Sequence, residues 1–537
     1  SPVIGGPSAG AAMTVATVAA LENWTVDQGV VMTGMINPDG SIGAVGGIPA
    51  KLNASVRNGA HTFLIPSGQG NITETVRVIE QDGFFVRSTE EQIIVNVIEI
   101  GDEQGIAVME IEDIRDAVYA YTGNEIPQVV LTGEVRTQEY MDAMQPLALA
   151  LLDESRVQYN ETYVIADQRL EDALISQIQA IEDAEADYDS ENYYASMSRS
   201  FNTMINLRRI KWYSLYLDSP NKDEYLSDLI ECVEAEIADA ELAIEDAKSK
   251  NGVLEGIGAA ESRLTISRER LDDARQAGSA DDAIDLLAFA MERARSAQWW
   301  ATLSCVGSGT GTAVMPCPCR QWHRWTPAGS PLPDDLLKDR AGRYYSQSAS
   351  ILAYAAALIS EAGGCEVLIV GAEDDLTRAR SELHTGYYAG AIYDSLHAMV
   401  QAGTAIELIG VADIDEKVNK SERDAMSAIL SARECGAEPI LATSAYEHAK
   451  TLAPSDIDRI VDYGYAKMVA RTARFFAGQG NLTTVQETNI SESIEKIVKP
   501  QRRIETVNEE TAETVDLGWY EVLIAVAAVY LIRRRYA

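Results

Sequence analysis

Basic residues, and lysines above all, are scarce in this chain of 537 residues. The sequence holds 82 acidic and 44 basic side chains, which gives a formal net charge of −38, and only 12 of the basic residues are lysines. A surface this acidic repels phosphate backbones and anionic lipid headgroups. The composition therefore argues against nucleic acid as a partner and against binding along an anionic membrane surface.

Cysteine is also rare, and the six cysteines are too scattered for a disulfide scaffold. Cys317 and Cys319 lie near His323 and could suggest a metal loop. Structural zinc usually needs two spaced pairs of ligands, and only this lopsided cluster is present. We therefore expect no metal and no other cofactor. Residues 305–334 are interpreted as an irregular insertion, with a local reading-frame error as the alternative.

A phosphate-binding motif is missing as well. The pattern Gly-x-x-x-x-Gly-Lys-Ser/Thr occurs nowhere in the sequence, and such a motif supplies the loop that holds the phosphates of ATP in P-loop enzymes. We therefore expect any activity of this chain to proceed without an ATPase of its own.

The most informative motif that is present lies at the start of the chain. Gly6-Pro7-Ser8-Ala9-Gly10 precedes an apolar, small-residue helix predicted from Ser8 to about Asn23. Lys51 follows 43 positions after Ser8 and is the only lysine among the first 200 residues. A serine hydroxyl becomes a good nucleophile when a base takes its proton, and a desolvated, neutral lysine can be that base. Ser8 and Lys51 are thus candidates for a Ser-Lys dyad.

The motif has a plainer interpretation too. A Gly-Pro-Ser-Ala-Gly segment is typical of a helix start, with Ser8 as the N-cap. Against that, glycines on both sides of Ser8 would let a substrate backbone approach. The N–H groups at the start of the helix also suit a developing oxyanion.

The pattern of secondary-structure signals in the sequence changes near residue 126. Residues 1–125 alternate strand and helix signals, and from 126 onward long acidic helices follow, with an apolar stripe at helical spacing in the 229–244 segment. A weak internal repeat is present: Asn-Tyr-Tyr-Ala at 192–195 and Gly-Tyr-Tyr-Ala at 386–389. It fits either stacked helical hairpins or an ordinary bundle. The strands expected in the first region are 30–36, 62–66 and 106–111; its helices are 8–23, 48–58 and 113–121. The two acidic helical regions are 126–304 and 335–515.

The C-terminus has the pattern of a membrane anchor. Residues 517–532 are nearly all apolar, carry aromatics at both edges and precede Arg533-Arg534-Arg535. Interfacial aromatics and arginines on the cytoplasmic side are typical of a transmembrane helix. The segment is only 16 residues long and contains Glu521, so an amphipathic or core helix is the alternative.

This orientation would leave residues 533–537 as a cytoplasmic tail and the bulk of the chain outside the cytoplasm. Seven of the 17 asparagines lie in Asn-x-Ser/Thr sequons, which adds weak support for export.

Several blocks of the first region together resemble the proteolytic domain of Lon-type peptidases, and most closely archaeal Lon-like proteins that are membrane-associated or exported and lack the ATPase. The matching blocks, in chain order, are Gly6-Pro7-Ser8-Ala9-Gly10, Met32-Thr33-Gly34, Gly46-Gly47-Ile48-Pro49-Ala50-Lys51 and Phe63-Leu64-Ile65-Pro66. The resemblance implies that Ser8 is the nucleophile, that Lys51 is the general base and that Thr33 supports the lysine. It also implies an oxyanion hole in the backbone around Ser8, where Gly6, Ala9 and Gly10 are the supporting residues.

The chain departs from the family pattern at three points. Met35 stands where an acidic residue is usual, and Gly5 stands where the classical enzymes often have Asp. Family members also carry several strands before the serine motif, whereas this chain begins seven residues ahead of Ser8. We therefore expect a partial α/β Lon-type proteolytic domain, then a large, mostly α-helical domain, and then the transmembrane helix.

The sequence thus predicts a membrane-anchored, ATP-independent serine endopeptidase that cleaves unfolded or flexible polypeptides. A homo-oligomer is compatible with the sequence. The alternative is a membrane-tethered helical scaffold or adaptor whose peptidase head is vestigial.

Overall fold

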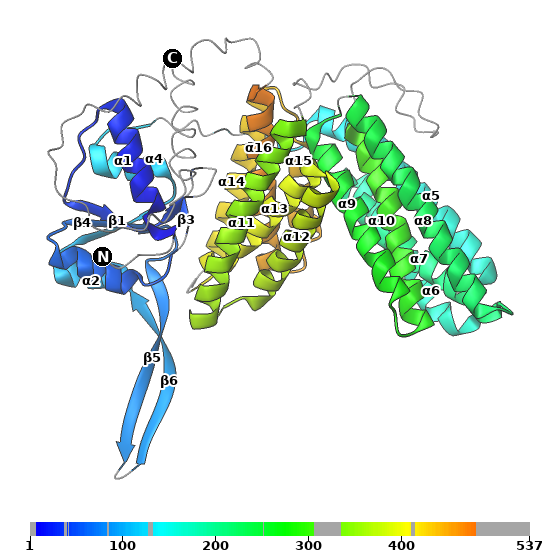
Figure 1. Ribbon diagram of the computed structural model, residues 1–537, viewed down its shortest axis with the longest axis horizontal. Helices are drawn as coiled ribbons and strands as arrows, with labels where there is room; N and C mark the ends of the chain where they lie inside the picture. Colours follow the sequence, from blue (N-terminus) through cyan, green and yellow to red (C-terminus); the bar gives the residue numbers. More distant parts are fainter. Residues whose placement is uncertain are drawn as a thin grey trace, which may run out of the picture. The chain divides into compact units, whose positions relative to one another are not determined.

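The computed structural model describes residues 7–36, 40, 42–43, 45–82, 85–126, 131, 133–250, 252–304, 334–362, 364–409 and 414–479. A small α/β region, built from residues 7–72 and 94–126, is followed by a large helical region that ends at residue 477, and each is a compact unit (Figure 1). The expected insertion at 305–334 lies almost entirely outside the described residues, as do the anchor at 517–532 and the tail at 533–537. No helix in the described part of the chain is long and apolar enough to span a membrane.

A three-stranded parallel sheet organises the α/β unit. Its strand order is β1-β4-β7, with bounds Val30–Met32, Thr62–Pro66 and Ala107–Ile111. Parallel neighbours need crossover connections, and α2 (Ile48–Arg57) and α3 (Val97–Gln104) lie in them. Helices α1 (Gly10–Glu22) and α4 (Ile114–Thr122) cover the opposite face of the sheet from α2 (Figure 1).

Apolar side chains from α1, α4 and the strands form the core between these layers. The expected strand at 62–66 appears with the same bounds, and the expected strand at 106–111 and helices at 48–58 and 113–121 appear with boundaries shifted by at most one residue. The α-helix predicted from Ser8 begins only at Gly10, because Pro7–Ala9 form a 3-10 turn.

The single strand expected at 30–36 is wrong. Strand β1 ends at Met32, and β2 (Met35–Ile36) turns away to pair antiparallel with β3 (Ile42–Gly43). The break falls at Thr33 and Gly34: the Thr33 amide still donates to the Leu64 carbonyl of β4 (3.0 Å), but the Gly34 amide donates to the Ser8 carbonyl (3.0 Å). A side chain at Gly34 would collide with Ile42, so the break requires glycine.

A long hairpin that the sequence patterns did not indicate follows β4. Strands β5 (Asn71–Asp82) and β6 (Phe85–Asn96) form a two-stranded sheet. The Val97 amide donates to the Gly70 carbonyl (2.8 Å) and closes the base of the hairpin.

The helical unit consists mainly of long helices. Their bounds in order are α5 Gln138–Ile165, α6 Glu171–Asp189, α7 Tyr193–Asp218, α8 Lys222–Ser249, α9 Leu254–Arg275, α10 Ala280–Ser304, α11 Asp334–Ala362, α12 Glu366–Thr385, α13 Tyr388–Glu407, α14 Ile414–Glu434, α15 Ile440–Thr451 and α16 Asp456–Gln479. The apolar stripe of the 229–244 segment is buried along α8, as the helical spacing predicts.

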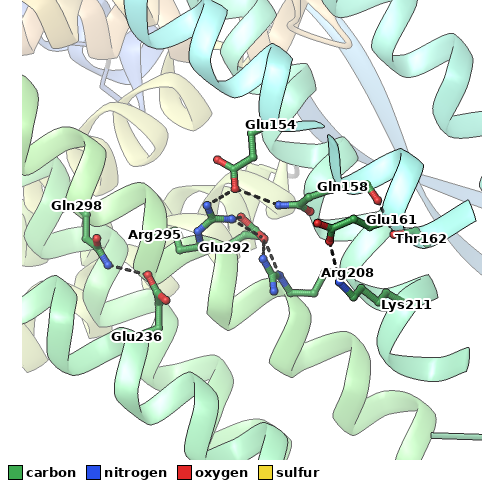
Figure 2. A network of polar contacts seen from close by, with 10 residues as sticks. All are labelled: Glu154, Gln158, Glu161, Thr162, Arg208, Lys211, Glu236, Glu292, Arg295 and Gln298. Atoms are coloured by element: carbon green, nitrogen blue, oxygen red, sulfur yellow. Dashed lines mark hydrogen bonds and ion pairs between the residues drawn. The ribbon is translucent and has the colours of Figure 1, made fainter. Parts of the chain in front are cut away.

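Ion pairs join several of these helices inside the unit (Figure 2). Glu292 of α10 is fully buried and accepts hydrogen bonds from Arg208 of α7 (2.6 Å) and from Arg295 of its own helix (3.2 Å). Arg295 also pairs with Glu154 of α5, and a further hydrogen bond links α10 to α8. Each arginine is paired, so the buried carboxylate has the partners that burial demands.

Buried glutamates cap three helices from neighbouring ones. Helices α7, α13 and α15 begin without a side-chain cap of their own, which leaves N–H groups that need acceptors. The acceptors, each a buried carboxylate, are Glu447 for the Ala195 amide (3.0 Å), Glu261 for the Gly390 amide (2.8 Å) and Glu255 for the Leu441 amide (2.9 Å). Helices α7 and α13 begin with the repeated Tyr-Tyr-Ala, so the repeat marks equivalent helix starts.

Burial works against the charge of these carboxylates. It raises the pKa of Glu255 to about 8 and also raises the pKa values of Glu261 and Glu447. The helix N-termini offset part of this effect, because their N–H groups and their positive potential favour the ionised form.

We expect Glu447→Ala to destabilise the helical unit. The change removes the acceptor of the Ala195 amide and the nearer acceptor of the buried Tyr140 hydroxyl (3.1 Å), which then keeps only Ser444 Oγ at 3.5 Å. Each buried unsatisfied group costs about 1–3 kcal/mol, so the free energy of unfolding should fall by roughly 2–5 kcal/mol. Urea unfolding followed by far-UV circular dichroism measures the loss. The control is Glu231→Ala on the exposed face of α8, and equal stability of the two variants would contradict the capping role.

Candidate active site

Ser8 lies in the 3-10 turn that leads into α1. The N-cap residue of α1 is Ala9, and no side chain caps the helix. Within the described residues the Ser8 hydroxyl makes no hydrogen bond, whereas its carbonyl accepts from the Gly34 amide. Interpreting Ser8 as an N-cap is therefore wrong. Its main chain is held by this bond, and in the described part of the chain no structural bond of its hydroxyl would compete with chemistry.

Thr33 connects the serine turn to the lysine. Its side chain is buried at the end of β1. Its Oγ1 accepts a hydrogen bond from Lys51 Nζ (3.1 Å) and donates to the Ser8 carbonyl (3.4 Å). Among the described residues no hydrogen bond joins Ser8 Oγ to Lys51 Nζ directly. The structure thus brings the three predicted residues together through the threonine hydroxyl.

Helix α2 presents Lys51 from its first turns. Gly47 starts the helix in the left-handed region (φ +68°), which favours glycine, and Pro49 lies in the first turn. The buried Ile48 and Leu52 fix the inner face of the helix and leave Lys51 half-buried beside them.

The surroundings of Lys51 favour its neutral form. Burial lowers the pKa of Lys51 below its usual 10.5. Among the described side chains no carboxylate forms an ion pair with Lys51 that would oppose the effect of burial.

Two of the residues predicted to support the oxyanion hole directly follow Ser8. Ala9 is exposed beside Ser8, and Gly10 begins α1 with Ile36 packed close against it. Gly6 lies outside the described residues. Met35, at the position where the resemblance predicts an acidic residue, is buried in β2.

Sequence reasoning missed Gln69. Its buried side-chain amide hydrogen-bonds both the amide and the carbonyl of Val45, just before α2. The only signal was a glutamine between two glycines after a buried strand. Among the described residues no group of three or more His, Cys, Asp or Glu side chains could hold a metal ion, and the Cys317/Cys319/His323 cluster lies outside them.

The segment that contains Ser8, Thr33 and Lys51 is similar in sequence to known proteins. Residues 3–97 match the family model of the Lon protease (S16) C-terminal proteolytic domain. A Lon protease of Buchnera aphidicola is 51% identical over 61 residues, which are 11% of this chain and 8% of that protein. The archaeal Lon protease of Thermoplasma acidophilum is 38% identical over 61 residues (11% and 9%), and a Lon protease of Clostridium acetobutylicum is 34% identical over 97 residues (18% and 12%).

The chain therefore spans only about a tenth of the length of these relatives. The matched segment contains Ser8, Thr33 and Lys51 together with the strands and helices that position them. The N-terminal region of this chain is thus similar to the C-terminal proteolytic domain of Lon proteases, and this similarity indicates a serine peptidase.

Proposed function

We propose that this chain is a serine endopeptidase in which Ser8 is the nucleophile and Lys51 is the general base. The observation that carries the proposal is the hydrogen-bonded series from Lys51 Nζ through Thr33 Oγ1 to the Ser8 carbonyl. It brings a half-buried amine to the turn that holds Ser8, whose hydroxyl makes no hydrogen bond within the described residues. The similarity to the Lon proteolytic domain supports the same assignment.

In the proposed mechanism Ser8 Oγ attacks the carbonyl carbon of the scissile peptide bond while its proton passes to neutral Lys51. The resulting alkoxide is stabilised by backbone amides at the start of α1, where the helix potential is positive. The intermediate collapses, the C–N bond breaks, and the Lys51 ammonium protonates the leaving amine. Water then hydrolyses the acyl-serine with Lys51 again as the base.

Thr33 positions the base in this scheme. Its own proton is donated to the Ser8 carbonyl, so its oxygen lone pair is available to Lys51. One N–H of the amine is held in this bond, and the nitrogen lone pair is then free to face Ser8 Oγ. Thr33 therefore acts through Lys51 and does not touch the substrate.

Three wider features also belong to the proposal. The chain would act without ATP hydrolysis of its own, because its sequence has no phosphate-binding loop. Cleavage would then be limited to unfolded or flexible polypeptides. The apolar segment 517–532 with its arginines would anchor the enzyme, and the active site would face away from the cytoplasm.

Replacing either member of the dyad should abolish cleavage. In the full chain we expect Ser8→Ala and Lys51→Ala each to lower kcat/KM on an unfolded, fluorescently labelled protein by roughly 10²–10⁴-fold or more, as expected for loss of a nucleophile or a general base. Arg57→Ala, an exposed change on the same helix as Lys51, is the control and should retain activity. Equal cleavage by wild type and both dyad variants would refute the dyad, and no cleavage by wild type would favour the scaffold alternative.

Activity should rise with pH along the ionisation of Lys51. Only the neutral amine can accept the proton of Ser8, and burial lowers the pKa of Lys51. The kcat/KM profile should therefore increase with pH and level off with an apparent pKa below 10.5. The control Arg57→Ala should give the same profile. A rate that falls as pH rises from neutral would contradict lysine as the base.

Removing the Thr33 hydroxyl should slow the reaction without preventing substrate binding. Thr33→Val keeps the shape but takes away the acceptor of Lys51 Nζ, and loss of a hydrogen bond of this kind, worth about 1.4 kcal/mol, corresponds to a roughly ten-fold lower kcat. Thr33→Ser retains the hydroxyl and should recover most of the activity. Steady-state kinetics separates kcat from KM, and a change confined to KM would contradict the positioning role.

A further inference from the structure

Gln69 is a buried amide that the mechanism above leaves unused. Its side chain is 4% exposed. Its Nε2 donates to the carbonyl of Val45 (3.0 Å), and its Oε1 accepts from the amide of Val45 (2.9 Å). Both polar groups of the Gln69 side chain therefore hydrogen-bond the main chain of Val45, as the main chain of a neighbouring β-strand would.

Val45 needs such a partner. Its side chain is buried, and it lies after β3 in a stretch with no regular secondary structure. Buried backbone groups must find hydrogen-bond partners, because each one left without a partner is costly. Gln69 supplies both partners at this position.

The two hydrogen bonds between Gln69 and Val45, called the clamp from here on, lie close in the chain to Lys51, the base of the proposed dyad. Two residues after Val45 comes Gly47, which starts α2 and whose carbonyl accepts from the Lys51 amide (3.2 Å). A fixed Val45 therefore fixes the entry to the helix one turn before Lys51. The direction from which Lys51 Nζ reaches Thr33 depends on where this turn begins.

The segment that carries Gln69 is itself firmly held. The Ser67 amide donates to the Ile111 carbonyl of β7 (2.9 Å), and the Gly70 amide donates to the Glu110 carboxylate (2.5 Å). The preceding strand β4 holds Thr33 through the Leu64 carbonyl. One short segment, residues 64–70, thus locates both the threonine that accepts from Lys51 and the loop that leads to Lys51.

We propose that Gln69 is a positioning residue that sets the place of Lys51 relative to Thr33 and Ser8, an inference that rests on the proposed peptidase function. Loss of the clamp frees the start of α2 and lets the amine drift from its bond to Thr33. Reaction rates are sensitive to such shifts, since a displacement of about 1 Å can cost roughly 10²-fold.

The test compares Gln69→Met with Gln104→Ala in the full chain. Methionine keeps the length and volume of glutamine but makes neither hydrogen bond to Val45. Gln104 is the matched control, because its exposed amide also bonds α2, at Asn53 (3.0 Å), away from the clamp. We expect Gln69→Met to lower kcat about 10- to 100-fold with KM changed less than about three-fold. Gln104→Ala should leave both unchanged, and Gln69→Asn, which keeps a shorter amide, should recover part of kcat.

A second readout does not require activity. Competitive acetylation followed by mass spectrometry reports how each lysine titrates, and Lys51 is distinguished from the other lysines by its peptide. In Gln69→Met we expect Lys51 to react with a higher apparent pKa than in wild type, because an amine released from the clamp gains solvent. Gln104→Ala should not change the titration, and thermal unfolding should show both variants folded.

The outcomes separate the two proposals. If Ser8→Ala abolishes cleavage but Gln69→Met leaves kcat and the Lys51 titration unchanged, the positioning role is overturned and the peptidase stands. If wild type shows no Ser8-dependent cleavage, the peptidase proposal fails. The acetylation of Lys51 then decides alone whether Gln69 positions that amine. A loss of stability with normal kcat in the folded fraction would reduce Gln69 to a structural role.

Discussion

The hydrogen bond from the Gly34 amide to the Ser8 carbonyl is the constraint on which the candidate site depends. It interrupts a strand that would otherwise continue from β1 into β2. The interruption exposes the end of β1 to the turn before α1, and there the buried Thr33 hydroxyl can reach both the serine main chain and Lys51. Thr33 itself remains bonded to β4 through its amide, and its side-chain hydroxyl accepts from Lys51.

In the helical unit the corresponding constraint is the burial of charged side chains in a chain with an excess of carboxylates. Glutamates serve as acceptors for helix starts, and arginines bridge several carboxylates at once. Arg378, for example, contacts Asp375 (2.9 Å), Asp394 (3.5 Å) and Glu269 (3.7 Å). The planar guanidinium suits such multiple contacts better than a lysine ammonium does. The shortage of lysine seen in the composition is therefore compatible with an interior rich in polar contacts.

Local signals in the sequence predicted much of the α/β unit. Pro7 marked the start of α1, and largely apolar runs marked β4 and β7, so Ser8 could be placed at one helix start and Lys51 near the start of the next helix. The break at Gly34 was missed, because the apolar residues on both sides favoured one strand, although a glycine within a strand pattern can mark such a break. The acceptors that the amides of Thr33 and Gly34 choose leave no local signal. The hairpin β5–β6 was missed because its charged residues mask the pattern of a buried strand, although Asp-Gly at 82–83 between segments rich in Thr, Val and Ile is typical of a hairpin turn.

Contacts between distant residues left no such signal. The bond between Gln69 and Val45 spans 24 positions, and glutamine has no characteristic spacing that would reveal it. The glutamate caps span far more of the chain, and only the repeated Tyr-Tyr-Ala hinted that two helix starts are alike. Met35 departs from the family pattern, and its buried position in β2 suits an apolar side chain.

Helix α9 carries two of the three capping glutamates, and this has a consequence for the order of folding. Glu261 and Glu255 satisfy the starts of α13 and α15, which lie 129 and 186 positions further along the chain. During synthesis α9 emerges long before the helices that its carboxylates complete. Glu261 can already pair with Lys248 of α8, but the starts of α13 and α15 gain their acceptors only after those helices have been made, and contacts between such distant residues form slowly.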